Sequence, residues 1–197
     1  MNASISDQVK LPLQFDPSAL QKDLMKLDES TWIEHFVREN YQGQWTVLPL
    51  RGPTGAVHPV RMIYSDPGCS DFSDTCYLDR CDNFKQVLHS FYCELHAVRL
   101  MKLTPGSVIR KHRDHDLSLE DGVVRLHIPV VTSPEVEFML NDKRVDMHEG
   151  ECWYLRLSDP HSVYNGGTID RVHLVIDAPV NDWLRNILSS GNQHCKI

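Results

Sequence analysis

The sequence has 197 residues, of which 41% are hydrophobic, and it carries a formal net charge of −7 at pH 7. This length predicts one domain with a sizeable core, and the acidic balance argues against a nucleic-acid-binding surface. No apolar run approaches the ~20 residues that a membrane-spanning helix needs, and the N-terminus lacks the charged and then apolar layout of a signal peptide. We therefore expect a cytoplasmic protein that binds neither nucleic acid nor membrane.

Two helices are predicted near the N-terminus. Residues 17–27 predict a short helix with Pro17 in its first turn, where the missing N–H of proline has no cost. Residues 31–40 predict a second helix, which Ser30 would cap. The apolar stripe of this second helix would consist of Ile33, Phe36 and Val37.

The next stretch is predicted to be extended and then irregular. Residues 43–63 look extended, with a break at RGPTG, and residues 64–82 form a loop rich in Asp, Ser, Cys and Gly. Such a long loop in a compact domain is often functional, so we expect both segments to cover the mouth of a pocket. A third helix follows, which Asn83 would cap. Its apolar residues recur at helical spacing: Phe84, Val87, Leu88 and Phe91.

From residue 95 onwards the sequence changes to short strand-like runs. About seven such runs, separated by Gly, Pro, Asp and Asn, occupy residues 95–178. A last helix is predicted in residues 179–197, with Trp183, Leu184, Ile187 and Leu188 on one face. Helices followed by many short strands are typical of a β-sandwich or barrel with helices on one outer face.

Six cysteines are spread over the chain, namely Cys69, Cys76, Cys81, Cys93, Cys152 and Cys195. The first three belong to the loop 69–81, in which no C-x-x-C pair occurs. We interpret the cysteines of this loop as reduced thiols, the usual state in the cytoplasm. A zinc or disulfide site in the loop is the alternative.

Residues 110–130 combine charged side chains with an apolar run: RKHRDHDLSLEDGVVRLHIPV. His112 and Asp114 are separated by one residue, and residues i and i+2 of a strand point to the same side, so both could hold one metal ion. His161, which follows a proline in a turn and leads into a strand, is the best candidate for a third ligand. Two histidines and one carboxylate leave positions open on an iron ion. In a chain with 11 histidines an H-x-D tripeptide is weak evidence alone, and a charged surface turn is the alternative.

Two predicted strands each place an arginine and a histidine opposite an apolar face. Arg171 and His173 alternate with apolar residues in RVHLVIDA, and Arg125 and His127 do so in VVRLHIPVV. An arginine that points into a barrel needs a carboxylate partner, which either the protein or a bidentate ligand could supply. For Arg171 the alternative is a salt bridge at the edge of the strand. For Arg125 we weigh a substrate carboxylate against a salt bridge to Asp114 or to Glu151.

Four segments together resemble the aspartyl/asparaginyl β-hydroxylase family: LMKLTPGSVIRKHRD, RLHIPV, EGECWYLRLSDPHSVYN and DRVHLVID. The likeness covers roughly residues 95–178, with weaker echoes from residue 43. Members are 2-oxoglutarate- and iron(II)-dependent oxygenases with a double-stranded β-helix, a cupin-like jelly roll. The H-x-D pairing looks more like the bacterial small-molecule members, including proline hydroxylases, than the animal peptide hydroxylase, which lacks the carboxylate ligand.

The resemblance implies a mainly β fold with flanking helices in a single domain over residues 1–197. Residues 1–94 would form a helical N-terminal part with loops that cover the pocket, residues 95–178 the double-stranded β-helix, and residues 179–197 a C-terminal helix. Iron(II) would be the cofactor, with 2-oxoglutarate and O₂ as cosubstrates. The reaction would hydroxylate a C–H bond of an amino acid or of an amino-acid residue in a peptide.

The resemblance also assigns a role to each candidate site residue. The iron ligands would be His112, Asp114 and His161. Arg171 would clamp the distal carboxylate of 2-oxoglutarate, and Arg125 and His127 match a family motif near the carboxylates of cosubstrate and substrate. The family's animal member uses a serine as a second contact to the distal carboxylate, whereas the strand before the H-x-D motif offers Met101 here. That contact is therefore unassigned.

Two other functions remain open at this point. One is a metal-dependent cupin of another reaction class, which would not turn over 2-oxoglutarate. The other is a non-catalytic jelly roll that binds a ligand without iron. Neither the identity of the substrate nor the oligomeric state follows from the sequence.

Overall fold

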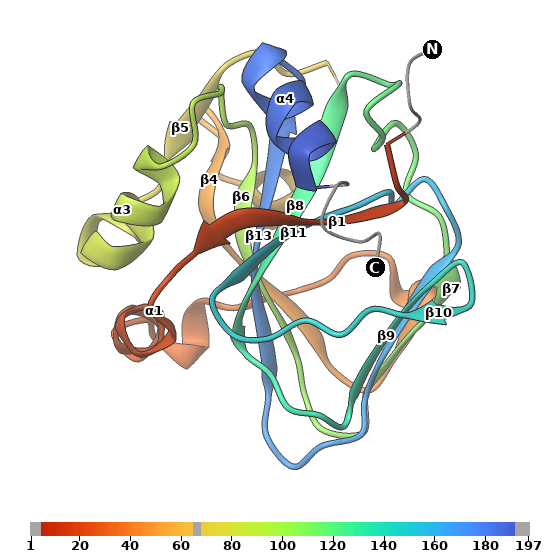
Figure 1. The fold of residues 1–197 in the computed structure, drawn as a ribbon. Coiled ribbons are helices and arrows are strands. Elements are labelled where there is room, and N and C mark those ends of the chain that lie inside the picture. The colour runs from red at the N-terminus through yellow and green to blue at the C-terminus, as the bar shows by residue number, and fades with distance from the viewer. Residues whose placement is uncertain (1–4, 65–67, 192–197) are drawn as a thin grey trace.

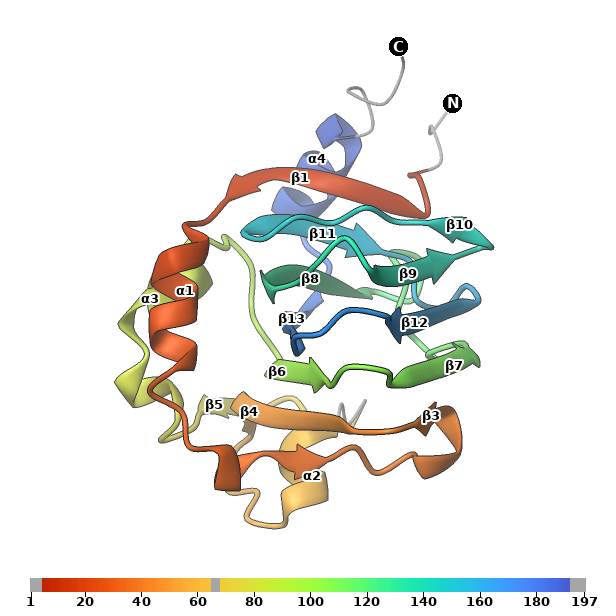
Figure 2. The same cartoon turned by 90° about the horizontal axis from the view of Figure 1, so that it is seen from below.

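The structure, a computed structural model, describes residues 5–64 and 68–191 (Figure 1). The major sheet contains, in spatial order, β1 (Gln8–Gln14), β11 (Glu151–Leu155), β8 (Val123–Val131), β13 (Arg171–Pro179), β6 (Val98–Leu103), β4 (Trp45–Pro53) and β2 (Ile33–Glu34), with β5 (Phe72–Asp74) paired to β4. The minor sheet contains β10 (Lys143–Arg144), β9 (Val136–Leu140), β12 (His161–Asn165), β7 (Val108–His112) and β3 (Tyr41–Gln42). All these pairs are antiparallel. The two sheets pack against each other (Figure 2). The predicted double-stranded β-helix is confirmed.

Three helices cover the outer face of the major sheet: α1 (Pro17–Leu24), α3 (Asp82–His89) and α4 (Asp182–Gly191). Figure 2 shows α1 and α3 on the side that faces away from the minor sheet. Their apolar residues share one cluster with the outward-facing residues of β8 and β13, including Leu126 and Leu174. The predicted helices on one outer face are therefore confirmed, because the sheet buries its apolar face only against such a layer.

A second apolar cluster fills the space between the sheets. It includes Leu103 and Val175 of the major sheet and Ile109, Phe138 and Val163 of the minor sheet. Along β13 the side chains alternate, so that Val172, Leu174 and Ile176 belong to the outer cluster and Val175 to the inner one. The predicted alternation is confirmed, and it leaves Arg171, His173 and Asp177 on the inward face of the strand.

The predicted helix over residues 31–40 is wrong. Two 3-10 turns, Glu29–Thr31 and Arg38–Asn40, flank the short strand β2 there. The first turn is capped by Asp28, whose Oδ1 accepts from the N–H of Ser30 at 2.8 Å, and not by Ser30. Pairing of β2 with β4 removes Ile33 from a helix, because tertiary pairing outweighs a weak local preference.

The segments around the pocket carry more regular structure than predicted. Residues 43–63 contain β4 and then a short helix, α2 (Pro59–Ile63), rather than extended chain throughout. The loop 64–82 contains β5 and a 3-10 turn, Leu78–Arg80, and α3 begins at Asp82, so Asn83 is inside the helix and not its cap. The start of α3 is instead capped from α1, because Asp23 Oδ2 accepts from the N–H groups of Asn83 and Phe84.

Two strands were not predicted from the sequence as such. Strand β1 was missed, and no bounds were predicted for β7, which ends at the H-x-D motif. Pro12 within β1 is tolerated because β1 is an edge strand. At the other end of the chain α4 ends at Gly191, and residues 192–197 lie outside the described residues. No helix within 5–64 and 68–191 is long and apolar enough to cross a membrane.

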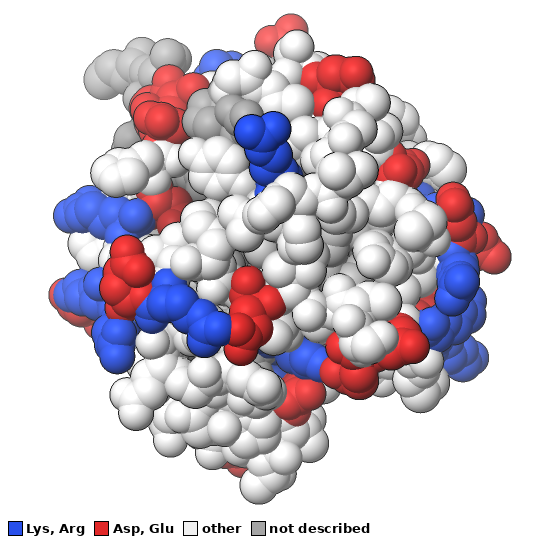
Figure 3. Space-filling view, turned by 180° about the vertical axis from the view of Figure 1, so that it is seen from behind, with Lys and Arg blue, Asp and Glu red and all other residues white. Residues whose placement is uncertain are grey.

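Five cysteines, from Cys69 to Cys152, are free thiols, while Cys195 lies outside the described residues. Burial raises the pKa of the Cys81 thiol to about 11, so this side chain is an uncharged core residue. On the face opposite to that of Figure 1, blue and red side chains lie next to one another in a band that crosses a largely uncharged surface (Figure 3).

Candidate metal and ligand site

A cavity of about 540 Å³ lies between the two sheets. All six residues that the sequence singled out line it: His112, Asp114, His161, Arg125, His127 and Arg171. They come from β7, β12, β8 and β13, and from the loop after β7. The structure therefore brings together side chains that are up to 59 positions apart in the chain.

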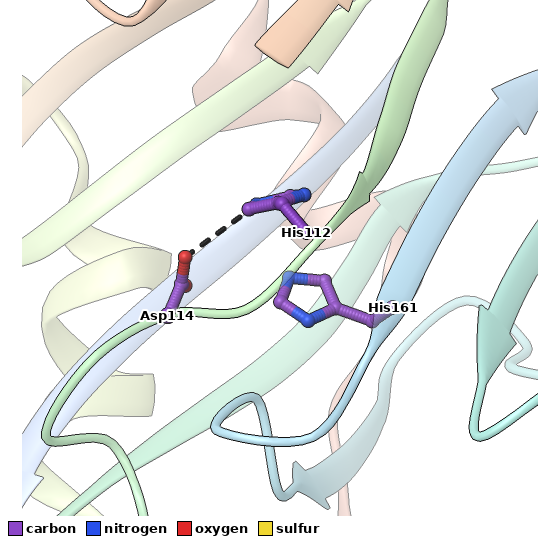
Figure 4. Close-up of side chains that lie close together, drawn as sticks. All are labelled: His112, Asp114 and His161. Atoms are coloured by element: carbon purple, nitrogen blue, oxygen red, sulfur yellow. Dashed lines mark ion pairs between the residues drawn. The ribbon is translucent and has the colours of Figure 1, made fainter.

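Three of these residues converge at one point of the wall (Figure 4). His161, the first residue of β12, pairs directly with His112, the last residue of β7. One ligand atom from each of His112, Asp114 and His161 lies within 4.8 Å of the others. Asp114 lies beyond the end of β7, so the i, i+2 geometry of a strand does not place it. Its backbone is held instead by a hydrogen bond from its N–H to the carbonyl of Leu157 at 2.9 Å.

Both imidazole rings are oriented by backbone carbonyls. His112 Nδ1 lies 2.7 Å from the carbonyl of Arg110, and His161 Nδ1 lies 3.0 Å from that of Asp159. A carbonyl can only accept, so each Nδ1 carries the proton and each Nε2 presents a lone pair to the site. Such a bond on the second ring nitrogen is found in nearly all metal-bound histidines.

The charges at this point are strongly coupled. Burial opposes ionisation of Asp114, but hydrogen bonding with His112 and the charge of Arg125 more than offset it, and the pKa of Asp114 lies well below its ordinary value. Burial likewise opposes protonation of His112, yet Asp114 and the carbonyl of Arg110 raise its pKa. Burial lowers the pKa of His161. An ionised carboxylate beside two imidazoles thus favours a positive charge at this point, which either a proton or a metal cation can supply.

This donor set fits a non-haem iron(II) ion. It offers two neutral imidazole nitrogens and one ionised carboxylate oxygen, and the second polar atom of each side chain is already bonded to the protein. Two histidines and a carboxylate on one face are the ligands of iron(II) oxygenases, with the remaining positions open. All three side chains line the cavity, so a cation held by them would be accessible from it.

Arg125 is held by two protein carboxylates. Its Nε and Nη2 donate to Asp177 at 2.6 and 2.9 Å, and its Nη1 donates to Asp114 Oδ2 at 2.7 Å. The salt bridge to Asp114, one of the two protein partners considered above, is therefore present. Glu151, the other, pairs with Lys10 instead. Asp177 was not foreseen as a partner of Arg125.

Arg171 lies in the same cavity with no carboxylate partner among the described residues. Its side chain is buried, and its Nη2 donates a hydrogen bond to His173 Nδ1 at 2.8 Å. Its Nε has no partner in the described part of the chain. Burial lowers the pKa of this arginine to about 9. A buried guanidinium in this state is costly unless an anion joins it.

The histidines next to Arg171 are uncharged. Burial, followed by the charge of Arg171, holds the pKa of both His127 and His173 well below the ordinary value. Neither ring nitrogen of His127 has a partner among the described residues, so this ring can serve a bound ligand. Because arginine cannot accept a hydrogen bond, His173 Nδ1 must be the acceptor in its contact with Arg171.

The aromatic wall of the cavity was missed in the sequence. His35 stacks on Trp45 with ring centroids 3.6 Å apart and on Phe36 at 4.9 Å, and all three line the cavity together with Tyr64 and Met101. Burial and the charge of Arg99 lower the pKa of His35 to about 3. The wrong helix over residues 31–40 hid this cluster, because His35 and Phe36 lie in irregular chain after β2 and both line the cavity.

Arg99 and Arg156 are two further arginines to compare with Arg171 as binders of a ligand carboxylate. Arg99 lines the cavity but pairs with Asp177 and donates to the carbonyl of Ile63 at 2.9 Å. Arg156 donates to the carbonyl of Ile5 outside the cavity wall. Among these arginines of the described chain, Arg171 is the one that lines the cavity without an ion pair.

Comparison with known proteins links this arrangement to oxygenases. The family model described as aspartyl/asparaginyl beta-hydroxylase matches residues 15–179. An L-proline cis-4-hydroxylase of Rhizobium meliloti (strain 1021) is 26% identical over 183 residues, which cover 89% of this chain and 63% of that protein. This chain therefore spans less than two thirds of the length of that relative.

Solved structures share the fold. A 2OG-Fe(II) oxygenase family oxidoreductase from Burkholderia pseudomallei has a TM-score of 0.56 at 12% identity, over 88% of this chain and 85% of that one. A Pseudomonas putida prolyl-4-hydroxylase has a TM-score of 0.52 at 13% identity, over 89% of this chain and 93% of that one. At these identities the likeness concerns the jelly-roll fold.

Proposed function

The chain belongs to the aspartyl/asparaginyl β-hydroxylase family, and from this premise we propose that it is a 2-oxoglutarate- and iron(II)-dependent dioxygenase. It hydroxylates a C–H bond of an amino acid or of an amino-acid residue. The observation that carries the proposal is the placement of Arg171, buried and without a carboxylate partner among the described residues, in the same cavity as the His112, Asp114 and His161 cluster. A jelly roll that binds its ligand without metal does not need the cluster, and a cupin that does not use 2-oxoglutarate does not need an arginine for its distal carboxylate.

Each cluster residue has a defined part in holding the metal. His112 and His161 would bind the metal through Nε2, because the Nδ1–H of each donates a hydrogen bond to a backbone carbonyl. Asp114 offers Oδ1, because its Oδ2 accepts from Arg125. When bound there, iron(II) together with 2-oxoglutarate and O₂ supplies the oxidising power for hydroxylation and leaves succinate and CO₂.

The residues around Arg171 hold the cosubstrate. The guanidinium binds the distal carboxylate of 2-oxoglutarate, which offsets the cost of its burial. His173 Nδ1 accepts from Nη2 of the arginine and so fixes the plane of the fork. His127, whose ring nitrogens are without partners among the described residues, faces the same space and donates to a cosubstrate carboxylate.

Trp45 is our candidate for the contact that the family's serine would make. Trp45 pairs with Leu103 of β6, and Leu103 pairs with Arg171 of β13, so the three form one row across the sheet. Its ring lines the cavity, and its Nε1–H has no acceptor among the described residues. A buried indole N–H usually finds a partner, and a carboxylate held by Arg171 would be one.

The substrate is an amino acid, free or within a peptide. The 26% identical relative is an L-proline cis-4-hydroxylase, and the aromatic wall of His35, Phe36, Trp45 and Tyr64 suits the apolar part of such a molecule. This wall also excludes water from the reacting C–H bond. A cytoplasmic location remains a prediction from the sequence.

The test is iron-dependent formation of succinate from 2-oxoglutarate, screened over free amino acids and short peptides. We expect turnover in the native protein and a loss of at least about 100-fold in His112→Ala and in His161→Ala, because each removes a ligand and its oriented lone pair. His89→Ala, an exposed histidine on α3, is the matched control and should behave as the native protein. Undiminished succinate formation in His161→Ala would contradict the assignment of the cluster.

A further inference from the structure

Four charged side chains, three of them buried and the fourth, Asp114, partly exposed, form a continuous chain of ion pairs that ends at the proposed metal cluster. Arg99 pairs with Asp177, Asp177 pairs with Arg125, and Arg125 pairs with Asp114. The far end is anchored to α2, because Arg99 Nη1 donates to the carbonyl of Ile63 at 2.9 Å. Two arginines and two aspartates balance in charge, which is what makes their burial tolerable.

Asp177 is the centre of this chain. It lies directly opposite Arg125 in the pairing of β13 with β8, and its carboxylate is 3% exposed. Its two oxygens accept from Nε and Nη2 of Arg125 at 2.6 and 2.9 Å, and Oδ2 also accepts from Arg99. A forked contact of this kind fixes the plane of a guanidinium as well as its position. Arg125 therefore has little freedom to move.

The third nitrogen of Arg125 selects one oxygen of Asp114. Nη1 donates to Oδ2 at 2.7 Å, while Oδ1 lies 3.5 Å from His112 Nε2 and faces the cluster. Asp114 needs such support, because it lies in the loop beyond β7. Its backbone bond to Leu157 fixes the Cα but not the rotation of the carboxylate.

We propose that Asp177 and Arg125 are positioning residues for the metal ligand Asp114: Asp177 locks Arg125, and Arg125 occupies Asp114 Oδ2 so that Oδ1 alone binds the cation. The inference rests on the proposed function, since it presupposes a metal at the cluster. It gives Arg125 a part that differs from binding a substrate carboxylate. When a residue that hydrogen-bonds to a metal ligand is replaced, metal affinity typically falls by ~10–100-fold.

The first test is a titration of the protein with Co(II) alone, followed by visible absorption, with Arg125→Lys as the main variant. Lysine keeps the positive charge but not the fork, so the electrostatic effect on the cation is unchanged and only the geometry is lost. We expect Co(II) to bind ~10–100-fold more weakly. Arg171→Lys makes the same change in the same cavity without touching Asp114, and its Co(II) affinity should equal that of the native protein.

A second variant and a double-variant comparison guard against indirect effects. Asp177→Asn, which unlocks Arg125 without touching Asp114, should weaken Co(II) binding in the same range. In an Asp114→Ala background, Arg125→Lys should have no further effect, because the carboxylate that it positions is gone. Equal losses from Arg125→Lys with and without Asp114 would overturn the proposal.

The native protein alone supplies a third measurement, which does not depend on any variant folding. The infrared difference spectrum on Co(II) binding reports the splitting of the two carboxylate stretches, and we expect the wide splitting of a monodentate carboxylate. A bidentate splitting would overturn the proposal.

The variant His112→Ala distinguishes failure of the proposed metal site from failure of the positioning role. If it keeps native Co(II) affinity, the metal site itself is wrong. If it loses affinity while Arg125→Lys and Asp177→Asn keep it, only the positioning role is wrong.

Discussion

A buried arginine lies at each end of the inner cavity, and the two arginines differ in their partners. At the metal end, which consists of the His112, Asp114 and His161 cluster with Arg125 and Asp177, the guanidinium meets two carboxylates. At the Arg171 end, which consists of Arg171 with His127 and His173, the guanidinium meets a neutral histidine. Burial opposes the charge at both ends, but the pKa of Arg125 is raised by Asp177 and Asp114, whereas that of Arg171 falls to about 9.

The difference separates an arginine that is paired with carboxylates of the protein from one that, in the proposed function, binds a carboxylate of the ligand. A buried charge without a partner destabilises a fold by several kcal/mol, so a chain keeps one only where something else supplies the counter-charge. The counter-charges of Arg125 are carboxylates of the protein itself, so its removal should lower the free energy of unfolding. Arg171 lacks a carboxylate in the described structure, and its removal should harm only what binds there.

The largest expected effect is a contrast in stability between Arg125→Met and Arg171→Met. Loss of Arg125 leaves Asp177 and Asp114 without their shared partner, and breaking a buried pair from one side costs roughly 3–5 kcal/mol. Loss of Arg171 removes an unpaired charge, so the free energy of unfolding should stay the same or rise. Urea unfolding of the metal-free proteins measures both values.

This contrast has a clear opposite. If Arg171→Met destabilised the metal-free protein as much as Arg125→Met, then Arg171 would be as well paired as Arg125, and the distinction between the two ends would fail. The slopes of the urea transitions should be equal in the two variants, because both expose the same surface on unfolding.

The next effect concerns the cosubstrate. Arg171→Lys keeps a charge at the end of the cavity but loses the two parallel bonds of a guanidinium to a carboxylate. A hydrogen bond to a charged group contributes roughly 1.5–3 kcal/mol, so the 2-oxoglutarate concentration for half-maximal turnover should rise ~10–100-fold. Arg156→Lys, outside the cavity wall, is the matched control, and a rise in that variant instead would move the clamp.

The smallest effect is a pH dependence at the Arg171 end. The folded-state pKa of His173 lies well below its ordinary value because of burial and Arg171, so below pH ~6.5 the unfolded chain takes up a proton that the folded chain refuses. Stability therefore falls as the pH is lowered from there. His173→Asn keeps an acceptor for Arg171 but takes up no proton, and its stability should fall less steeply, by up to ~1.4 kcal/mol per pH unit.

Urea unfolding at several pH values between 4 and 7 measures this slope in the native protein and the variant. Identical slopes would mean that His173 is already protonated in the folded protein, which its role as acceptor from Arg171 forbids.

The sequence by itself determined the fold class and the members of the site. Alternation of apolar and polar residues in VVRLHIPVV and RVHLVIDA directs Arg125, His127, Arg171 and His173 to one side of their strands, because the side-chain period of a strand is two whatever the strand packs against. The H-x-D tripeptide and the distant His161 matched a known pattern, and all of them line one cavity.

Only the tertiary structure decided which of these side chains are already paired. Asp177 reaches Arg125 because β13 lies beside β8 in one register, and a shift by one residue would have turned it to the outer face. The aromatic wall also depends on tertiary contacts, since β2 pairs with β4 and the N–H of His35, just after β2, donates to the carbonyl of Trp45. Local periodicity fixes the direction of a side chain, but the identity of its partner depends on strand order and register, which contacts distant in the sequence determine.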